Sequence, residues 1–158
     1  MKITNNKMIP LKLINASFIT QYNCNFTNNT ASEDGGAVYF WSNGEVRNCN
    51  FSANTATESG GAVRFWNQGN VTNCNFTNNK ATGDYSYGGA IWFTAEGTVE
   101  NCNFTNNSAS NRGGAVYFYG NGDVTNCNFT NNSARYGGAI RFSSTGNVTN
   151  CNFTHNNA

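Results

Sequence analysis

The sequence has little leucine, little histidine and little net charge, and each shortage argues against a class of protein. Leucine occurs only at Leu11 and Leu13 in 158 residues, so the chain lacks the apolar stripes with which helices build a core. We therefore expect no helices beyond the first residues. The nine basic and eight acidic residues leave a formal net charge of +1, which gives no long-range field to attract nucleic acid or an anionic membrane.

The N-terminus also lacks the continuous apolar core of a signal peptide. It reads MKITNNKMIPLKLINASF, and its apolar stretches are broken by Lys7, Pro10 and Lys12. No stretch long enough to cross a membrane follows. We therefore expect no membrane insertion by this segment. If the protein is exported, the chain is either a mature product or a piece of a longer protein, and we favour the piece.

The chain is instead rich in asparagine and glycine, and it contains a short repeated motif. Asn fills 32 positions and Gly 17, and the apolar residues that remain are mainly Phe, Val, Ile, Tyr, Trp and Cys, which favour strands. The heptapeptide NCNFTNN begins at residue 23, and near copies begin at 48, 73, 101, 126 and 150. Its cysteines recur at intervals of 25, 25, 28, 25 and 24 residues: Cys24, Cys49, Cys74, Cys102, Cys127 and Cys151.

A second motif recurs with the same period, which indicates a solenoid. GGAVYF, GGAVRF, GGAIWF, GGAVYF and GGAIRF begin at residues 35, 60, 88, 113 and 137, and each is followed by a Gly turn with Val two residues later. In such repeats one coil cannot bury its apolar face alone and stacks on its neighbours. We assign residues 23–158 to the repeats and residues 1–22 to an N-terminal cap or degenerate first coil, with Ala16 and Phe18 in the Cys and Phe columns.

Alternation within one copy predicts which side chains point inward. Val38 and Phe40 share one parity and are placed inside, whereas Tyr39 and Trp41 are placed outside. A turn at residues 43–44 reverses the chain, and Val46 begins a second strand.

A corner at Asn48 then resets the phase, so that Cys49 and Phe51 point inward, and Asn54 makes another bend. The predicted fold is all-β, a parallel β-helix of about five to six coils, each of roughly 25 residues as the cysteine intervals show. It is expected to be right-handed because parallel crossovers nearly always are.

In-register stacking explains the repeated heptapeptide. Stacked coils lie about 4.8 Å apart, so each column of identical residues touches itself. Phe stacks on Phe, and Cys is a small apolar filler beside it. Asn at a corner can donate its amide to the Asn of the next coil and also accepts tight-turn backbone angles. We assign this asparagine ladder to the corner residues Asn48, Asn73, Asn101, Asn126 and Asn150.

Two motifs carry a resemblance to known surface proteins. They are GGA[VI] and F-x-x-N, the latter at Phe26 to Asn29, Phe51 to Asn54, Phe76 to Asn79, Phe104 to Asn107 and Phe129 to Asn132. Both resemble the repeats of the chlamydial polymorphic membrane proteins. In their Asn-rich composition the repeats are also similar to those of adhesin-like surface proteins of methanogenic archaea. The resemblance spans roughly residues 23–158. It implies a right-handed β-helix displayed outside the cell in an adhesive or structural role.

The cysteines leave two interpretations open. Neighbouring coils would bring their Cα atoms within disulfide range, but the repeat alone dictates their spacing, so we favour a buried column of free thiols over disulfides. A zinc site is not expected, because His155 is the only histidine and no CxxC occurs. We expect no cofactor.

An enzyme would need clustered carboxylates or a calcium site on one face. The acidic residues are few, and only Glu33, Asp34, Glu58 and Asp84 could gather along one edge, in the loop before the double glycine. We favour solvated turn residues there and expect no catalytic residues and no enzyme.

The outward column of the GGAVYF strand is the candidate binding surface. Aromatic rings and guanidinium groups at such spacing stack and offer a flat platform for sugar rings or a protein face. The alternative is that these side chains merely cover one another. The loop GDYSYGG, which lengthens one interval to 28 residues, adds two further tyrosines. The surface comprises Tyr39, Trp41, Arg64, Trp66, Tyr85, Tyr87, Trp92, Tyr117, Tyr119 and Arg141, with Thr94 and Ser143 completing the flanking positions.

A second outward column runs through the N-F-T triplets, for example Asn75 with Thr77. Such N-x-[ST] triplets are glycosylation acceptors where the host has the machinery. A regular Thr grid can also bind ice, but repeat geometry explains the column without either function.

These observations favour a non-catalytic, extracellular or cell-surface scaffold of the adhesin type. The alternative is a carbohydrate-binding or carbohydrate-active β-helix that uses the aromatic column. Its partners would be a cell-surface glycan or protein, or further copies of itself. Terminal coils of a solenoid expose unpaired strand edges, so we also expect head-to-tail stacking into filaments.

Overall fold

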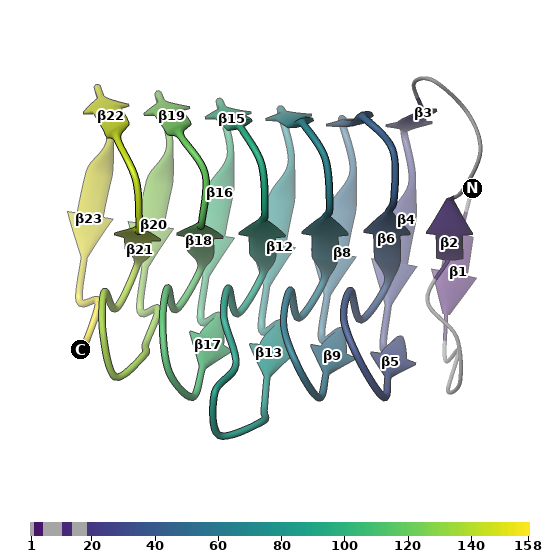
Figure 1. Ribbon diagram of the computed structural model, residues 1–158, viewed down its shortest axis with the longest axis horizontal. Coiled ribbons are helices and arrows are strands. Elements are labelled where there is room, and N and C mark those ends of the chain that lie inside the picture. The colour runs from purple at the N-terminus through teal and green to yellow at the C-terminus, as the bar shows by residue number, and fades with distance from the viewer. Residues whose placement is uncertain (1, 5–10, 14–18) are drawn as a thin grey trace.

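The protein is a parallel β-solenoid in which four sheets run along one axis (Figure 1). The computed structural model describes the backbone of residues 2–4, 11–13 and 19–158, and the side chains from residue 19 on. Every strand pairing within these residues is parallel and in register between successive coils. In the part of the chain so described, no helix is long and apolar enough to cross a membrane. The predicted all-β coil architecture is confirmed.

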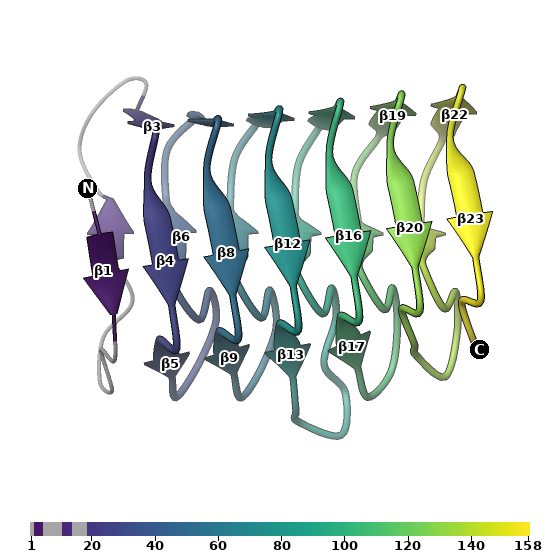
Figure 2. The ribbon, with the colours of Figure 1, turned by 180° about the vertical axis from the view of Figure 1, so that it is seen from behind.

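The four sheets are named A to D, and the strands of a coil follow one another in the order B, C, A, D, although the last two coils add no strand to sheet D. Sheets A and B form opposite faces (Figures 1 and 2). Sheet A contains β1 (Lys2–Thr4), β4 (Asn25–Thr27), β8 (Asn50–Ser52), β12 (Asn75–Thr77), β16 (Asn103–Thr105), β20 (Asn128–Thr130) and β23 (Asn152–Thr154). Sheet B contains β2 (Leu11–Leu13), β6 (Val38–Phe40), β10 (Val63–Phe65), β14 (Ile91–Phe93), β18 (Val116–Phe118) and β21 (Ile140–Phe142).

The two remaining sheets connect these faces. Sheet C contains β3 (Ile19–Tyr22), β7 (Gly44–Arg47), β11 (Gly69–Thr72), β15 (Gly97–Glu100), β19 (Gly122–Thr125) and β22 (Gly146–Thr149). The short strands of sheet D are β5 (Thr30–Ala31), β9 (Thr55–Ala56), β13 (Lys80–Ala81) and β17 (Ser108–Ala109).

The core consists of columns of identical side chains. As predicted, Val38, Phe40, Val46, Cys49 and Phe51 are all buried. The Phe rings of sheet A stack with centroids 4.7 to 5.0 Å apart, and those of sheet B with centroids 4.6 to 4.9 Å apart. This spacing equals the distance between neighbouring strands in a sheet, so stacking the rings requires no adjustment of the backbone.

The chain turns sharply at two corners in each coil, before and after the sheet A strand. Asn48 and Ala53 have φ values of 51° and 54°, and the equivalent residues of the other coils lie within the same narrow range. Asparagine adopts this left-handed region more readily than other residues that carry a Cβ. The predicted corner at Asn48 is therefore confirmed, whereas the second bend is at Ala53 rather than at Asn54.

The asparagine ladder exists, but the predicted residues do not form it. These residues form the corner through their left-handed backbone conformation, and their side chains are exposed: Asn48, Asn73, Asn101, Asn126 and Asn150. The reason is geometric, because a left-handed corner residue points its side chain away from the coil. The buried ladder belongs to the Asn of the F-x-x-N motif, which comprises Asn29, Asn54, Asn79, Asn107, Asn132 and, at its half-buried end, Asn156.

Asn79 illustrates why this position requires asparagine. Its amide nitrogen donates to Asn107 Oδ1 at 3.0 Å and to the carbonyl of Phe51 at 3.1 Å. Its own Oδ1 accepts from the backbone nitrogen and the amide of Asn54, each at 3.0 Å. The side chain thus satisfies groups in both neighbouring coils while it is itself fully buried.

A second ladder lies on the outer face of sheet A and runs in the opposite sense. Asn75 donates its amide to Asn50 Oδ1 at 2.9 Å, and Asn103 donates to Asn75 at the same distance. In the buried ladder the amides donate toward the C-terminal coil, whereas here they donate toward the N-terminal coil. The outer side chains are solvated, so this ladder fixes orientation more than it contributes stability.

The double glycine is required where coils approach most closely. Gly60 has a φ of +63°, and a Cβ on Gly61 would lie 2.1 Å from the carbonyl oxygen of Gly89. The first glycine therefore permits the turn and the second permits the contact between coils.

The three N-terminal strands extend the sheets by one coil. β1 pairs with β4, β2 with β6 and β3 with β7, which places Ile3 level with Phe26 and Leu13 level with Phe40. The predicted places of Ala16 and Phe18 in the columns fall outside the described residues. The pairing of residues 2–4, 11–13 and 19–22 corresponds to a first coil built from a different sequence.

We expect Asn79→Ala to reduce the free energy of unfolding by about 3 kcal/mol or more, because a buried group left without its partner costs about 1–3 kcal/mol and several are left here. Asn75→Ala, which cuts the exposed ladder in the same coil, should cost less than about 1 kcal/mol. Urea unfolding followed by circular dichroism measures both variants. Equal losses in the two would show that burial does not distinguish the ladders.

Candidate functional site

The outer column of sheet B forms as predicted. Strand register places Arg64 level with Tyr39 and Trp92, Trp92 level with Tyr117, and Tyr117 level with Arg141. Adjacent coils therefore bring rings and guanidinium groups directly beside one another along the axis.

Three members of this outward column are covered rather than exposed. Tyr39, Arg64 and Tyr117 expose only 7%, 3% and 3% of their surfaces. They are covered by side chains from the loop before the double glycine and by the flanking aromatic residues. For these three residues, the alternative in which the side chains cover one another holds.

Arg64 is the centre of the covered part. Its Nη1 donates to Asp34 Oδ2 at 2.5 Å, and its Nη2 donates to Thr94 Oγ1 at 3.1 Å. Its guanidinium carbon lies 3.3 Å from the ring centroid of Trp92 and 5.1 Å from that of Trp66. Thus three coils contribute to holding one charged group.

Asp34 is not the solvated turn residue that the sequence suggested. It is buried beside Arg64, and this burial raises the pKa of its carboxyl above the ordinary value of 3.8, although the guanidinium acts in the opposite direction. This pair could not be predicted from the sequence, because 30 residues and a loop of unknown path separate its members.

The insertion in the third repeat covers the next part of the column. Ser86 fixes the loop by donating its hydroxyl to the carbonyl of Ala81 at 2.8 Å and accepting from the backbone nitrogen of Ser110 at 3.0 Å. The Tyr87 ring then stacks on Tyr117 with centroids 4.9 Å apart and lies 5.7 Å from Trp92. The lengthened interval therefore yields a folded lid of aromatic side chains.

A hollow of about 330 Å³ opens at the edge of this lid. Its walls include Tyr85, Tyr87 and Trp92, with Glu58 at its rim. Tyr85 is the most exposed of the described aromatic side chains, and Trp92 is half-buried with an indole nitrogen that is itself buried and donates to no described acceptor. The hollow thus combines apolar walls with one carboxylate.

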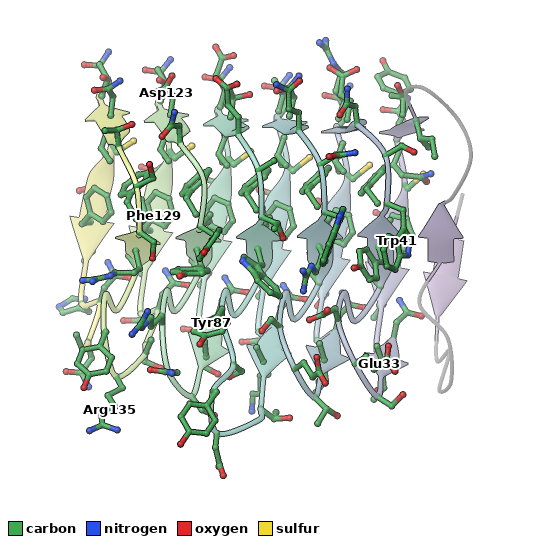
Figure 3. The ribbon with its side chains drawn as sticks, viewed as in Figure 1. Glu33, Trp41, Tyr87, Asp123, Phe129 and Arg135 are labelled. Atoms are coloured by element: carbon green, nitrogen blue, oxygen red, sulfur yellow. The ribbon has the colours of Figure 1, made fainter. Side chains whose placement is uncertain are left out.

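The remaining predicted surface residues form an open strip beside the covered part. Trp66, Tyr119 and Arg141 are exposed, and Trp41 is half-buried, with its ring stacked 4.9 Å from that of Tyr39. Figure 3 shows Trp41 on this face near the first coils and Tyr87 below the middle of the view, between Glu33 and Arg135 along the horizontal axis. The strip is interrupted by Thr94 and ends at Ser143, which is hydrogen-bonded to the Tyr117 hydroxyl at 2.7 Å.

The acidic residues do not converge. Glu33, Glu58 and Asp84 are exposed in successive loops, and Asp34 is turned inward to Arg64. Within residues 19–158 and the two short N-terminal strands, no three His, Cys, Asp or Glu side chains lie close enough to hold a metal ion. A polar hollow of about 550 Å³, which the sequence did not indicate, lies at the turn into sheet C between Glu96 and Asp123.

The six cysteines are free thiols in one inner column. Cys74 shows the pattern, since its sulfur accepts from the backbone nitrogen of Cys49 at 3.4 Å and its thiol donates to the carbonyl of Thr72 at 3.1 Å. Burial raises the pKa of Cys102 well above its ordinary value and also raises the pKa of Cys151. A thiol that is buried and hydrogen-bonded in this way has a structural use.

Comparison with known protein families agrees with the fold. A family model described as a right-handed β-helix region matches residues 61–158, which agrees with the predicted handedness. A second model, described as the Chlamydia polymorphic membrane protein repeat, matches residues 23–40. No curated protein and no solved structure matches the chain.

We expect Arg64→Ala to lower the free energy of unfolding by about 3 kcal/mol, because removing one partner of a buried pair leaves the other charge uncompensated. Arg141→Ala, in the same column but exposed, should change it by less than about 0.5 kcal/mol. Chemical unfolding at pH 7 tests both, and similar small effects would show that the Arg64 pair is not structural.

The pH dependence of Arg64→Ala provides a second test. Because the folded pKa of Asp34 lies above 3.8, the folded state retains this proton to a higher pH than the unfolded chain does. The free energy of unfolding therefore falls as pH rises through the interval between the two pKa values. Loss of the guanidinium should widen this interval, and adding Asp34→Asn should abolish its contribution.

Proposed function

This chain belongs to the right-handed β-helix family, and we propose that it is a non-catalytic, extracellular scaffold of the adhesin type. The match of residues 23–40 to the Chlamydia polymorphic membrane protein repeat supports display at a cell surface. The rigid columns of the core support a structural role, since they hold each outer side chain at a fixed height along the axis.

The observation that carries this proposal is the open aromatic strip on sheet B. Trp66 and Tyr119 are exposed large aromatic residues, and Arg141 extends the same face. Exposed aromatic and arginine side chains gathered on one face are typical of surfaces that bind another molecule. The buried Arg64 guanidinium lies 5.1 Å from the centroid of the Trp66 ring and supports that end of the strip. The proposed partner is a protein or glycan on another surface.

Carbohydrate binding is the second candidate, and the hollow beside the inserted loop favours it. Tyr85, Tyr87 and Trp92 give apolar walls on which a sugar ring could lie, and Glu58 could accept from its hydroxyls. The loop is fixed by its own hydrogen bonds, so the hollow exists before any ligand binds.

We expect Trp66→Ala with Tyr119→Ala to reduce binding to intact cells or to an immobilised surface protein at least tenfold, because truncating central aromatic contacts typically costs more than about 1 kcal/mol each. Tyr22→Ala, an equally exposed aromatic on sheet C, is the matched control and should bind normally. A glycan panel run in parallel separates the candidates. Sugar binding abolished by Tyr85→Ala would favour the second, and cell binding unaffected by the double variant would contradict the first.

We further propose that coils stack end to end between molecules. Among the described residues, no strand pairs with the outer edges of β21, β22 and β23. Val148 and Phe153 there expose 43% and 47% of their surfaces and border an apolar hollow of about 480 Å³. A second copy docked through β1 to β3 would place Ile3 opposite Phe153, which continues the core columns.

We expect light scattering coupled to chromatography to show particles larger than a monomer that grow with protein concentration. Phe153→Asp, which puts a charge into the proposed contact, should leave a monomer. Asn152→Asp is the control, because its side chain lies on the outer face of sheet A rather than on the core side. Circular dichroism checks that both variants remain folded, and a strictly monomeric parent protein at high concentration would contradict the proposal.

A further inference from the structure

The described chain contains many N-x-[ST] triplets, the acceptor motif for N-linked glycans, and their number alone does not say which are usable. The structure separates them into two groups by backbone geometry. Eight lie within strands, namely those beginning at Asn25, Asn50, Asn70, Asn75, Asn103, Asn128, Asn147 and Asn152. Three lie across the corner between sheets A and D, namely those beginning at Asn28, Asn106 and Asn131.

The strand triplets are poor acceptors in the folded protein. Successive side chains on one face of a strand are about 6.6 Å apart, and the extended backbone keeps the asparagine away from its hydroxyl residue. Several of the amides are also already used. Asn75 and Asn103 donate to the preceding coil at 2.9 Å, and Asn147 donates to Asp123 at 2.8 Å.

The corner triplets have the opposite properties. Asn28, Asn106 and Asn131 all have a φ of 55° and exposed side chains, and none of their amide nitrogens donates to another described group. The backbone bends within the triplet, so the amide and the hydroxyl residue that follows are not held apart by an extended strand. The middle residue of each is a member of the buried ladder, for example Asn107, and this fixes the corner while the acceptor points outward.

We propose that Asn28, Asn106 and Asn131 are N-glycosylation sites of this protein and that the eight strand triplets remain unmodified in the folded state. The proposal rests on the proposed extracellular role, because the donor sugar meets chains on the export route. In the reaction the amide nitrogen attacks the anomeric carbon of a polyprenyl-diphosphate-linked oligosaccharide. A nitrogen–carbon bond forms, the carbon–oxygen bond to the diphosphate breaks, and the amide loses one proton to a base of the transferase.

Such glycans would form one row along a single edge of the solenoid. The corner between sheets A and D borders the face shown in Figure 2, whereas the aromatic strip lies on sheet B on the opposite face. Sugars there would add bulk and solubility along one edge and leave the proposed binding strip open.

The repeats provide their own controls, because three coils lack a corner triplet. Ala53 and His155 occupy the acceptor position in two of them, and in the third Lys80 follows Asn78 and Asn79 where the hydroxyl residue should be. Lys80→Thr should therefore make Asn78 an acceptor. Ser108→Ala should abolish modification of Asn106 without changing the corner residue itself.

The test uses purified, folded protein, a single-subunit oligosaccharyltransferase and a polyprenyl-diphosphate-linked oligosaccharide, with occupancy read by peptide mass spectrometry. A synthetic peptide of residues 99–110 contains both Asn103 and Asn106 without the fold. We expect comparable occupancy of the two in the peptide, and at least tenfold higher occupancy of Asn106 than of Asn103 in the folded protein. Lys80→Thr should add one site at Asn78, and Ser108→Ala should remove one.

Equal occupancy of Asn103 and Asn106 in the folded protein would overturn the proposal. So would a folded protein that is unmodified at all three corners under conditions that modify the peptide. Because the assay does not depend on where the protein resides or what it binds, failure of the adhesin proposal would leave the result interpretable.

Discussion

Parallel, in-register stacking is the constraint on which the rest of this structure depends. Each side chain lies directly beside the equivalent side chain of the next coil, so a residue must be compatible with its own copy at about 4.8 Å. Phe, Cys and Asn meet this requirement in different ways. Phe rings stack face to face, the thiol accepts from one coil, and the buried Asn bonds to both neighbours. The repetitive sequence is a consequence of this geometry.

Residues depart most from strict repetition where the solenoid meets its surroundings. The outer positions of sheet B read Tyr39, Arg64, Trp92, Tyr117 and Arg141, and this is where three coils join around one buried charge. A charge stacked on its own copy would be repelled, so Arg64 is placed between aromatic neighbours and paired with an acid from a loop. Variation in this column therefore builds a local cluster that an exact repeat could not form.

The sequence predicted the fold well because period and alternation are both local signals. The spacing of the cysteines gave the coil, and alternation around Phe40 and Phe51 gave the inward residues. The buried Asn54 was misassigned as a bend because the second left-handed corner, at Ala53, resets the alternation once more. A signal was present, since the corner position varies between Asn, Ala and His whereas the ladder position is always Asn. A position that accepts alanine does not depend on its side chain.

The candidate site was only partly predictable for a different reason. The strand register alone predicted the outer column of sheet B. The exposure of its side chains, however, depends on loops whose paths do not follow the repeat. The pairing of Asp34 with Arg64 and the folding of Tyr87 over Tyr117 both come from the loop before the double glycine. These contacts reach across coils and vary from one to the next, so neither alternation nor spacing could reveal them.

The buried ladder also has a consequence for how such a chain can change in length. Every interior coil offers the same acceptor to the coil before it and the same donor to the coil after it, as the bonds of Asn54, Asn79 and Asn107 show. Deleting or duplicating one whole coil would therefore recreate the same junction. A gene made of near-identical units is prone to unequal recombination, and this fold would accept the products. The distance between the two ends of the solenoid could then vary in steps of one coil while the chemistry of each coil stays the same.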